Sequence, residues 1–121
     1  MAIDPAELDC GYLTTRGRAS GRPHEIEIWF ALEGEHLYFL SGDGERSDWV
    51  RNLIADHRVT IELGAQTRSA TARFVTEPDE DALARRLLVK KYQPRDSDDL
   101  TEWGRTSLPV AISWGSDREL V

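Results

Sequence analysis

Polar and apolar residues alternate along several short segments of the chain, and residues 24–32 (HEIEIWFAL) show the pattern most clearly. A period of two places Ile26 and Ile28 on one face of a strand and the intervening acids on the other. Because a half-buried antiparallel strand keeps one face in water, solvation explains Glu25 and Glu27 better than a pair of catalytic carboxylates does. We therefore predict a strand with one wet face in this segment.

Five more segments favour strands, because they alternate or are rich in apolar and β-branched residues. They are residues 11–15, 36–41, 57–63, 66–76 and 107–114. Residues 36–41 (HLYFLS) are almost continuously apolar, which predicts a strand in the centre of the sheet. The first strands follow one another through short turns, which indicates an antiparallel meander.

Three segments carry helical signals. They are residues 47–57, 78–92 and 97–103. In the first, Ser47 is a good N-cap, and Trp49, Leu53 and, less strictly, Val50 and Ile54 fall on one side. The second begins with proline and acids and ends with lysines, which agrees with the helix dipole.

The order of these elements predicts the fold class. Short hairpins and a single long helix argue against a doubly wound parallel sheet, which needs repeated helical crossovers. We expect a mainly β (α+β) protein: a small, partly closed antiparallel barrel with helices packed outside. A chain of 121 residues is the size of one domain, so we take residues 1–121 as that domain.

Charge and composition narrow the classes of partner. Twenty-two acidic residues against 15 basic ones give a net charge of -7, which argues against binding nucleic acid or anionic membrane. No apolar run is long enough for a membrane span, and the N-terminus does not look like a signal peptide, so we expect a cytoplasmic protein. Cys10 is the single cysteine, and the three histidines share no ligand spacing, so no metal site is predicted.

The segment TTRGRASGRP, residues 14–23, is the strongest local feature and is called the arginine loop below. Three arginines stand among two glycines with no acid between them. Glycine permits positive φ and close approach of the backbone to a ligand, and several guanidinium groups can hold one anion. A solvated hairpin tip explains the same composition, so both interpretations stay open at this point.

Two weaker features lie further along the chain. Residues 41–53 pass from a buried strand through a glycine-rich loop into a helix start, which suits an anion or a polar ring edge. An ordinary capped connection fits them equally well. Tyr92 and Trp103 bracket a polar loop and suit either the wall of a pocket or the edge of the core.

Taken in order, these segments resemble the deazaflavin-dependent nitroreductases, also described as quinone reductases that use coenzyme F420. Members carry a segment like TTTGRxSGxPR, matched here by the arginine loop with His24 in place of the final basic residue. A W-x-x-N-L helix follows, here residues 49–53. Tyr92, Trp103, Arg105 and Thr106 and the strand LPVAIS complete the match over nearly the whole chain.

The resemblance implies a split β-barrel related to the flavin-binding oxidases of pyridoxamine phosphate. It also implies a reductase that moves hydride from reduced F420 to a quinone, nitroaromatic or activated alkene. The residues it implies for the cofactor are Arg16, Gly17, Arg18, Ala19, Ser20, Gly21, Arg22, Tyr38, Leu40, Ser41, Gly42, Arg46, Trp49, Asn52 and Leu53. Ser41 and Tyr92 are the candidates to donate a hydrogen bond or proton to the acceptor.

This sequence also departs from the family pattern. Many relatives have lysine directly after the loop serine, whereas this chain has Gly42, with Arg46 as the nearest base. The loop before Trp49 is also about two residues shorter. We therefore keep two alternatives: the same fold binding FMN, and a non-catalytic module that stores or carries a cofactor. A homodimer is left open as the assembly.

Overall fold

The computed structural model describes residues 4–114 and places seven strands in them. The strands are β1 (Gly11–Arg16), β2 (Pro23–Ile28), β3 (Ala31–Glu33), β4 (His36–Ser41), β5 (Arg58–Leu63), β6 (Gln66–Phe74) and β7 (Leu108–Ser113). The helices are α1 (Asp48–Ala55), α2 (Pro78–Tyr92) and α3 (Thr101–Thr106), with short 3₁₀ turns η1 (Pro5–Glu7), η2 (Gly44–Arg46) and η3 (Gln93–Arg95). Among the described residues, no helix is long and apolar enough to cross a membrane.

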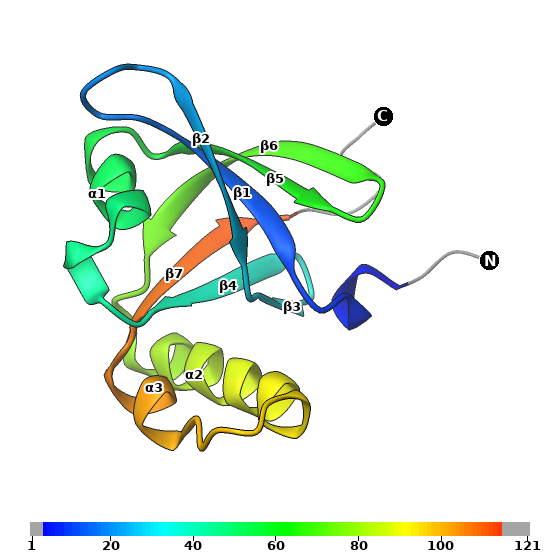
Figure 1. Ribbon diagram of the computed structural model, residues 1–121. Coiled ribbons are helices and arrows are strands. Elements are labelled where there is room, and N and C mark those ends of the chain that lie inside the picture. The colour runs from blue at the N-terminus through cyan, green and yellow to red at the C-terminus, as the bar shows by residue number, and fades with distance from the viewer. Residues whose placement is uncertain (1–3, 115–121) are drawn as a thin grey trace.

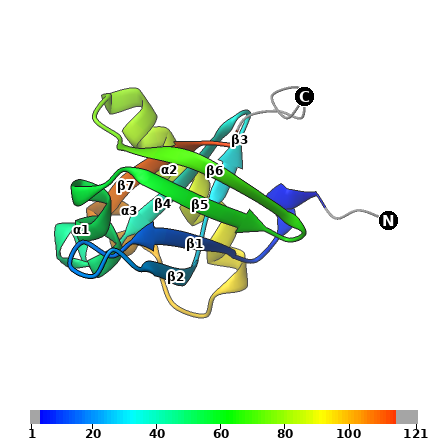
Figure 2. The same ribbon diagram turned by 90° about the horizontal axis from the view of Figure 1, so that it is seen from above.

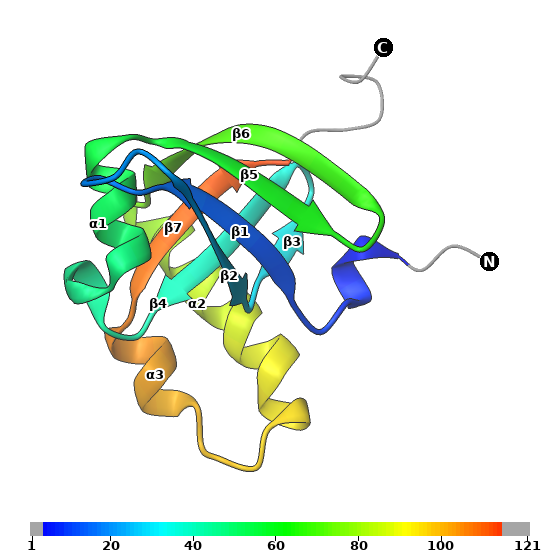
Figure 3. The same cartoon turned by 45° about the horizontal axis from the view of Figure 1, so that its top comes forward.

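The strands form one curled sheet in the order β2-β1-β5-β6-β7-β4-β3, with every neighbouring pair antiparallel. Figures 1 and 3 show the sheet wrapping into a partly closed barrel, with α1 at one end beside the β1–β2 hairpin. Seen from above in Figure 2, β6, β5, β1 and β2 lie side by side on one wall. The predicted antiparallel split barrel is confirmed.

The predicted meander of the first strands is wrong, because residues 24–32 do not form one strand. β2 ends at Ile28 and β3 begins at Ala31, and the two lie at opposite ends of the strand order. Phe30 in the gap is fully buried, and side chains satisfy its backbone: its N–H donates to the Tyr92 hydroxyl and its carbonyl accepts from the Lys91 amine. These distant groups compensate for the lost strand pairing.

Two apolar clusters lie on the two faces of the curled sheet. The inner cluster fills the barrel and includes Leu13, Phe39 and Ile61. The outer cluster packs α2 against the sheet and includes Tyr38 and Leu88. β4 contributes to both clusters, so its apolar run reflects burial on two faces, although it lies one strand from the edge of the sheet rather than in the centre.

The helices form close to where the sequence predicts them, with local differences. Ser47 flanks α1 but makes no side-chain capping bond, and its hydroxyl donates to the Gly44 carbonyl. Ile54 is 53% exposed rather than buried, because the helix is short and turns this position to solvent. The third helix is Thr101–Thr106, shifted from the predicted residues 97–103.

Candidate cofactor groove

The tip of the β1–β2 hairpin depends on its two glycines. Gly17 N–H donates to the Arg22 carbonyl, and Gly21 N–H donates to the Gly17 carbonyl. Gly21 has φ of 74°, a conformation that side chains rarely adopt. A Cβ at Gly17 would lie 2.5 Å from the His24 ring, closer than packing permits. The glycines of the arginine loop therefore fix its shape, whatever it binds.

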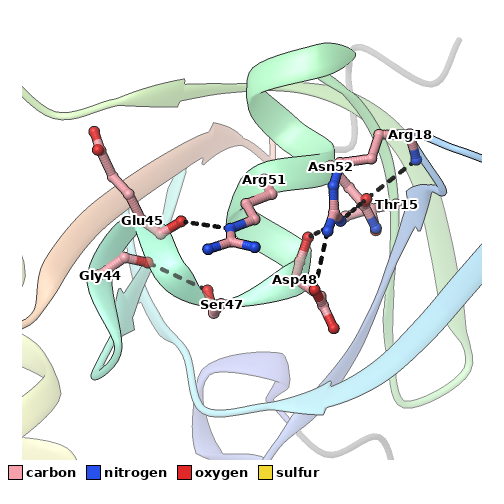
Figure 4. A network of polar contacts seen from close by, with 8 residues as sticks. All are labelled: Thr15, Arg18, Gly44, Glu45, Ser47, Asp48, Arg51 and Asn52. Atoms are coloured by element: carbon pink, nitrogen blue, oxygen red, sulfur yellow. Dashed lines mark hydrogen bonds and ion pairs between the residues drawn. The ribbon is translucent and has the colours of Figure 1, made fainter.

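The three arginines of the loop do not converge on one point. The Arg18 guanidinium folds onto α1, donating to the Asn52 side-chain oxygen at 2.8 Å and to the Asp48 carboxylate at 3.2 Å (Figure 4). Arg16 lines a cavity on the other face of the hairpin, and Arg22 is exposed. The predicted cluster of three guanidinium groups around one anion is absent from this structure, because Asp48 and Asn52 hold Arg18.

Asn52 joins the hairpin to α1 from the helix side. Its side-chain amide donates to the Thr15 hydroxyl at 3.1 Å, and its oxygen accepts from both the backbone N–H and the guanidinium of Arg18 (Figure 4). The residue is buried, with 4% of its surface exposed. Asn52 lies at the groove, as predicted, but its polar atoms are used in holding the hairpin against the helix.

The loop between β4 and α1 is ordered by two serines. The Ser41 hydroxyl donates to the Gly44 carbonyl at 2.9 Å and lies 3.0 Å from the Ser47 hydroxyl. The Arg51 guanidinium donates to the Glu45 carbonyl at 3.4 Å from the first turn of the helix (Figure 4). The hydrogen of the Ser41 hydroxyl is therefore already used, which does not fit donation to an acceptor.

A groove runs along β2 from the arginine loop to the loop after β4. It consists of two adjoining hollows of about 480 and 340 Å³ that share Ile26 and Trp49. Nine of the predicted cofactor residues line it. They are Gly17, Arg18, Ala19, Ser20, Leu40, Ser41, Gly42, Trp49 and Asn52.

The remaining predicted residues lie elsewhere. Arg16 and Gly21 line the cavity across the hairpin, and Leu53 belongs to the inner core. The Tyr38 hydroxyl donates to Glu80 on α2, and burial, followed by this hydrogen bond, raises the pKa of Tyr38 to about 12. Neither Arg22 nor Arg46 is among the residues that line the groove.

Aromatic side chains close the far end of the groove. Trp29 and Trp103 line it, with their rings edge to face at a centroid distance of 5.5 Å. Tyr92 stacks on Trp29 at a centroid distance of 4.3 Å, and a Cβ at Gly42 would lie 3.4 Å from the Trp103 ring. Trp29 was missed in the sequence because it falls where the strand pattern breaks.

Tyr92 lies behind this wall rather than in the groove. Its side chain is 2% exposed, and its hydroxyl donates to the backbone carbonyl of Asp9 while accepting from Phe30 N–H. Burial raises the pKa of Tyr92 to about 12. The expectation that Tyr92 gives a proton to the acceptor does not fit this placement, because the hydroxyl is enclosed and its hydrogen is used.

Comparison with known proteins identifies the family. Residues 6–114 match the model of the F420H(2)-dependent quinone reductase family. An F420-H2-dependent reductase (FDR-A) has a similar structure, with a TM-score of 0.70 and 20% identity over 93% of this chain and 99% of that one.

Two further solved structures share the fold. A second F420 reductase has a TM-score of 0.63 and 19% sequence identity, and the match covers 92% of this chain and 90% of that one. A putative pyridoxamine 5'-phosphate oxidase from Listeria innocua has a TM-score of 0.64 and 14% sequence identity, and the match covers 89% of this chain and 85% of that one. Because the family model covers almost the whole chain, this protein belongs to the F420H(2)-dependent quinone reductase family and is an oxidoreductase of that type.

Proposed function

We propose that this protein transfers hydride from reduced coenzyme F420 to a quinone, nitroaromatic or activated alkene, and that the groove along β2 holds the cofactor. The observation that carries the proposal is that two hollows share Ile26 and Trp49, so that a polar end containing Arg18 adjoins an aromatic end. A cofactor with a flat ring and an anionic tail needs both ends in one cleft.

The polar end fits an anionic group. Arg18, Ser20 and His24 line it, and the Ser20 hydroxyl accepts from Arg22 N–H, which leaves the hydroxyl hydrogen for a ligand. Two acids also line this end: Asp48 lies against Arg18 and compensates its charge, and Glu25 follows His24 in the chain. The polar end therefore suits one phosphate rather than a run of negative groups.

The aromatic end fits a flat ring. Gly42 has no side chain and faces Trp103, while Trp49 forms the junction of the two hollows. Trp103 is held in place by Trp29, which is stacked on Tyr92. These contacts hold the wall rigid, which orients a bound ring and its acceptor without reorganisation.

The bound cofactor would supply the hydride, and the residues of the protein bind the cofactor, orient its ring and shield it from water. Ser41 orders the loop that carries Gly42 through its bonds to Gly44 and Ser47. Because the hydroxyls of Ser41 and Tyr92 are already used, we assign protonation of the reduced acceptor to solvent at the open side of the groove, where Ser20 and Gly42 are exposed.

The proposal is tested by titrating the purified protein with F420 and, separately, with FMN, following cofactor fluorescence. Oxidation of reduced F420 is then measured with menadione and with a nitroaromatic. We expect tighter binding of F420 than of FMN, and acceptor-dependent oxidation. Tighter binding of FMN would favour the flavin alternative, and F420 binding without turnover on either acceptor would favour a carrier.

The assembly is a separate question within the same proposal. The sequence left a homodimer open, and we retain it as the assembly to be tested. Light scattering coupled to size exclusion measures the mass directly. A mass near twice 13.7 kDa supports the dimer, and a mass near 13.7 kDa rejects it.

A further inference from the structure

A second cavity lies across the β1–β2 hairpin from the groove, on the outer face of β1, β5 and β6. Its volume is about 640 Å³, and it shares Thr15 alone with the residues that line the groove. The residues that matter here are Thr14, Arg16, Asp56, Arg58, Thr60 and Ser69. The proposed cofactor function gives none of these residues a role, and only the family resemblance had assigned Arg16 to the cofactor.

Strand register arranges the polar side chains of this cavity in two rows. Thr14 pairs with Thr60, and Thr60 pairs with Ser69, so three hydroxyls cross three neighbouring strands on one face. Arg16 follows Thr14 by two residues in β1, and Arg58 precedes Thr60 by two residues in the antiparallel β5. Alternation of side chains places these arginines on the same face, in the row next to the hydroxyls.

The row of arginines brings like charges together. Thr15 pairs with Val59, so the next position sets Arg16 beside Arg58, a cross-strand pair that destabilises a sheet. Asp56 compensates Arg58 through a 2.9 Å ion pair and a further bond at 3.1 Å. Arg16 has no side-chain hydrogen bond or ion pair with any residue from 4 to 114, so its charge stays available in the cavity.

The charge of Arg16 acts on Asp56, while one side of the Arg16 guanidinium is uncovered. The pKa of Asp56 is lowered mainly by hydrogen bonds from Arg58, with a smaller contribution from the charge of Arg16. The Arg16 guanidinium runs alongside Gly21, where a Cβ would lie 3.6 Å from it. The missing side chain at Gly21 leaves this side of the guanidinium uncovered.

We propose that this outer cavity is a binding site for a small hydroxylated organic oxyanion, a carboxylate or a phosphate monoester, distinct from the cofactor groove. The oxyanion binds Arg16, and it reaches Arg58 at Nη1, because Nε and Nη2 of Arg58 are bonded to Asp56. The hydroxyl groups of the ligand exchange hydrogen bonds with Thr14, Thr60 and Ser69. The site is independent of the cofactor, because binding there uses neither Trp49 nor the Ser41–Gly42 loop.

The test is an amide NMR titration of the ¹⁵N-labelled protein at constant ionic strength. The probes are inorganic phosphate, glycerol 3-phosphate and glycerate, with chloride as the control. Glycerol 3-phosphate and glycerate carry the same 1,2-diol with different oxyanions. We expect saturable shifts at residues 14–16, 58–60 and 69–71, and tighter binding of a hydroxylated probe than of inorganic phosphate. The stronger of the two organic probes identifies the oxyanion.

Three variants sharpen the test. Arg58→Gln removes one guanidinium and leaves Asp56 unpaired, so binding weakens about tenfold. Arg86→Gln, an exposed position on α2, makes the same change of net charge and leaves the affinity as it was. Thr60→Val removes one hydroxyl at nearly constant volume, so glycerol 3-phosphate binds several-fold more weakly while inorganic phosphate is unaffected.

Three results would overturn the inference. The first is that shifts appear at residues 17–20 and 49, in the groove, instead of at the cavity. The second is that shifts grow linearly and chloride reproduces them. The third is that Arg58→Gln and Arg86→Gln bind alike. Equal affinities for inorganic phosphate and the hydroxylated probes would remove the role of the hydroxyl row. None of these outcomes depends on whether F420 binds.

Discussion

Asn52 makes three side-chain hydrogen bonds, and all of them join α1 to the β1–β2 hairpin. It donates to Thr15 and accepts twice from Arg18, while only 4% of its surface is exposed. Groups buried in this way are costly to leave without partners. Asn52 therefore holds the arginine loop, which forms one wall of the groove, in position against α1.

Asn52→Leu is expected to lower the free energy of unfolding by about 2 kcal/mol, because the Thr15 hydroxyl and the Arg18 N–H lose their partner. Urea denaturation measures the change. Ile54→Ala is the matched control on the same helix: its side chain is 53% exposed, so the expected cost is below about 0.5 kcal/mol. Equal effects of the two substitutions would contradict the role given to Asn52.

A substitution at Tyr92 tests whether its hydroxyl has a structural role or a catalytic one. Tyr92→Phe removes the bonds to Asp9 and Phe30 and leaves Phe30 N–H buried without a partner, so a loss of about 1–3 kcal/mol in unfolding free energy is expected. Calorimetry measures that loss. Turnover per folded molecule is expected to stay within a factor of two, and a fall of a hundredfold would restore Tyr92 as the proton donor.

For single residues, the sequence predicted positions at the groove more often than it predicted the contacts that each side chain makes. Trp49, Asn52 and Gly42 were all named from motifs and all line it. The partners of Asn52 and Tyr92 lie 34 to 83 residues away in the chain, and local spacing carries no information about such pairs.

Among the elements, α2 is tied to the sheet by one charged network. Arg73 on β6 makes two 2.7 Å bonds to Glu80 on α2, and the Tyr38 hydroxyl on β4 donates to the same carboxylate at 2.8 Å. The hydrogen bonds from Arg73 are the largest cause that lowers the pKa of Glu80 from 4.5 to about 2. The network holds the helix that supports the aromatic wall.

This network predicts a specific pH dependence. Because the pKa of Glu80 is lower in the folded state, its stabilisation is complete above pH 4.5 and is lost as the pH falls to about 2. The difference in unfolding free energy between the wild type and Glu80→Gln should therefore be largest near neutrality and shrink through that window. Urea denaturation at a series of pH values measures it.

The control for this prediction is Asp79→Asn, an exposed acid on the same helix with no ion pair to another residue in the described part of the chain. Its difference from the wild type should vary less between pH 4.5 and pH 2. A Glu80→Gln difference that stays constant over this window would show that the carboxylate is not held by Arg73.

The type of each helix and strand was largely predictable because local patterning decides it. The alternation of β5 and the charge distribution along α2 both appear in the structure as expected. The division of residues 24–32 between β2 and β3 was not predictable, since it depends on Lys91 and Tyr92 satisfying the backbone of Phe30. A strand pattern does not reveal bonds made by a distant helix.

For the whole molecule, the hairpin divides two surfaces that each contain an arginine of the loop, in a chain with a net charge of -7. Arg18 lies at the groove, whereas Arg16 and Arg58 lie at the outer cavity. The sequence indicated a single basic cluster because the three loop arginines are adjacent in the chain. β1 ends at Arg16, and the chain then turns through Gly17 and Gly21, where Arg18 bonds to Asn52 on α1, so nearness in sequence did not give nearness in space.

The central claim is that the groove along β2 holds the deazaflavin, and Gly42 offers the most direct measurement. Its φ is not positive, so larger residues fit its backbone, and its Cβ would point at Trp103 from 3.4 Å. We predict that Gly42→Leu folds with an unchanged melting temperature but binds F420 at least tenfold more weakly in a fluorescence titration, while Gly42→Ala loses threefold or less. Equal F420 affinity in the wild type, Gly42→Ala and Gly42→Leu would contradict the placement of the cofactor in this groove.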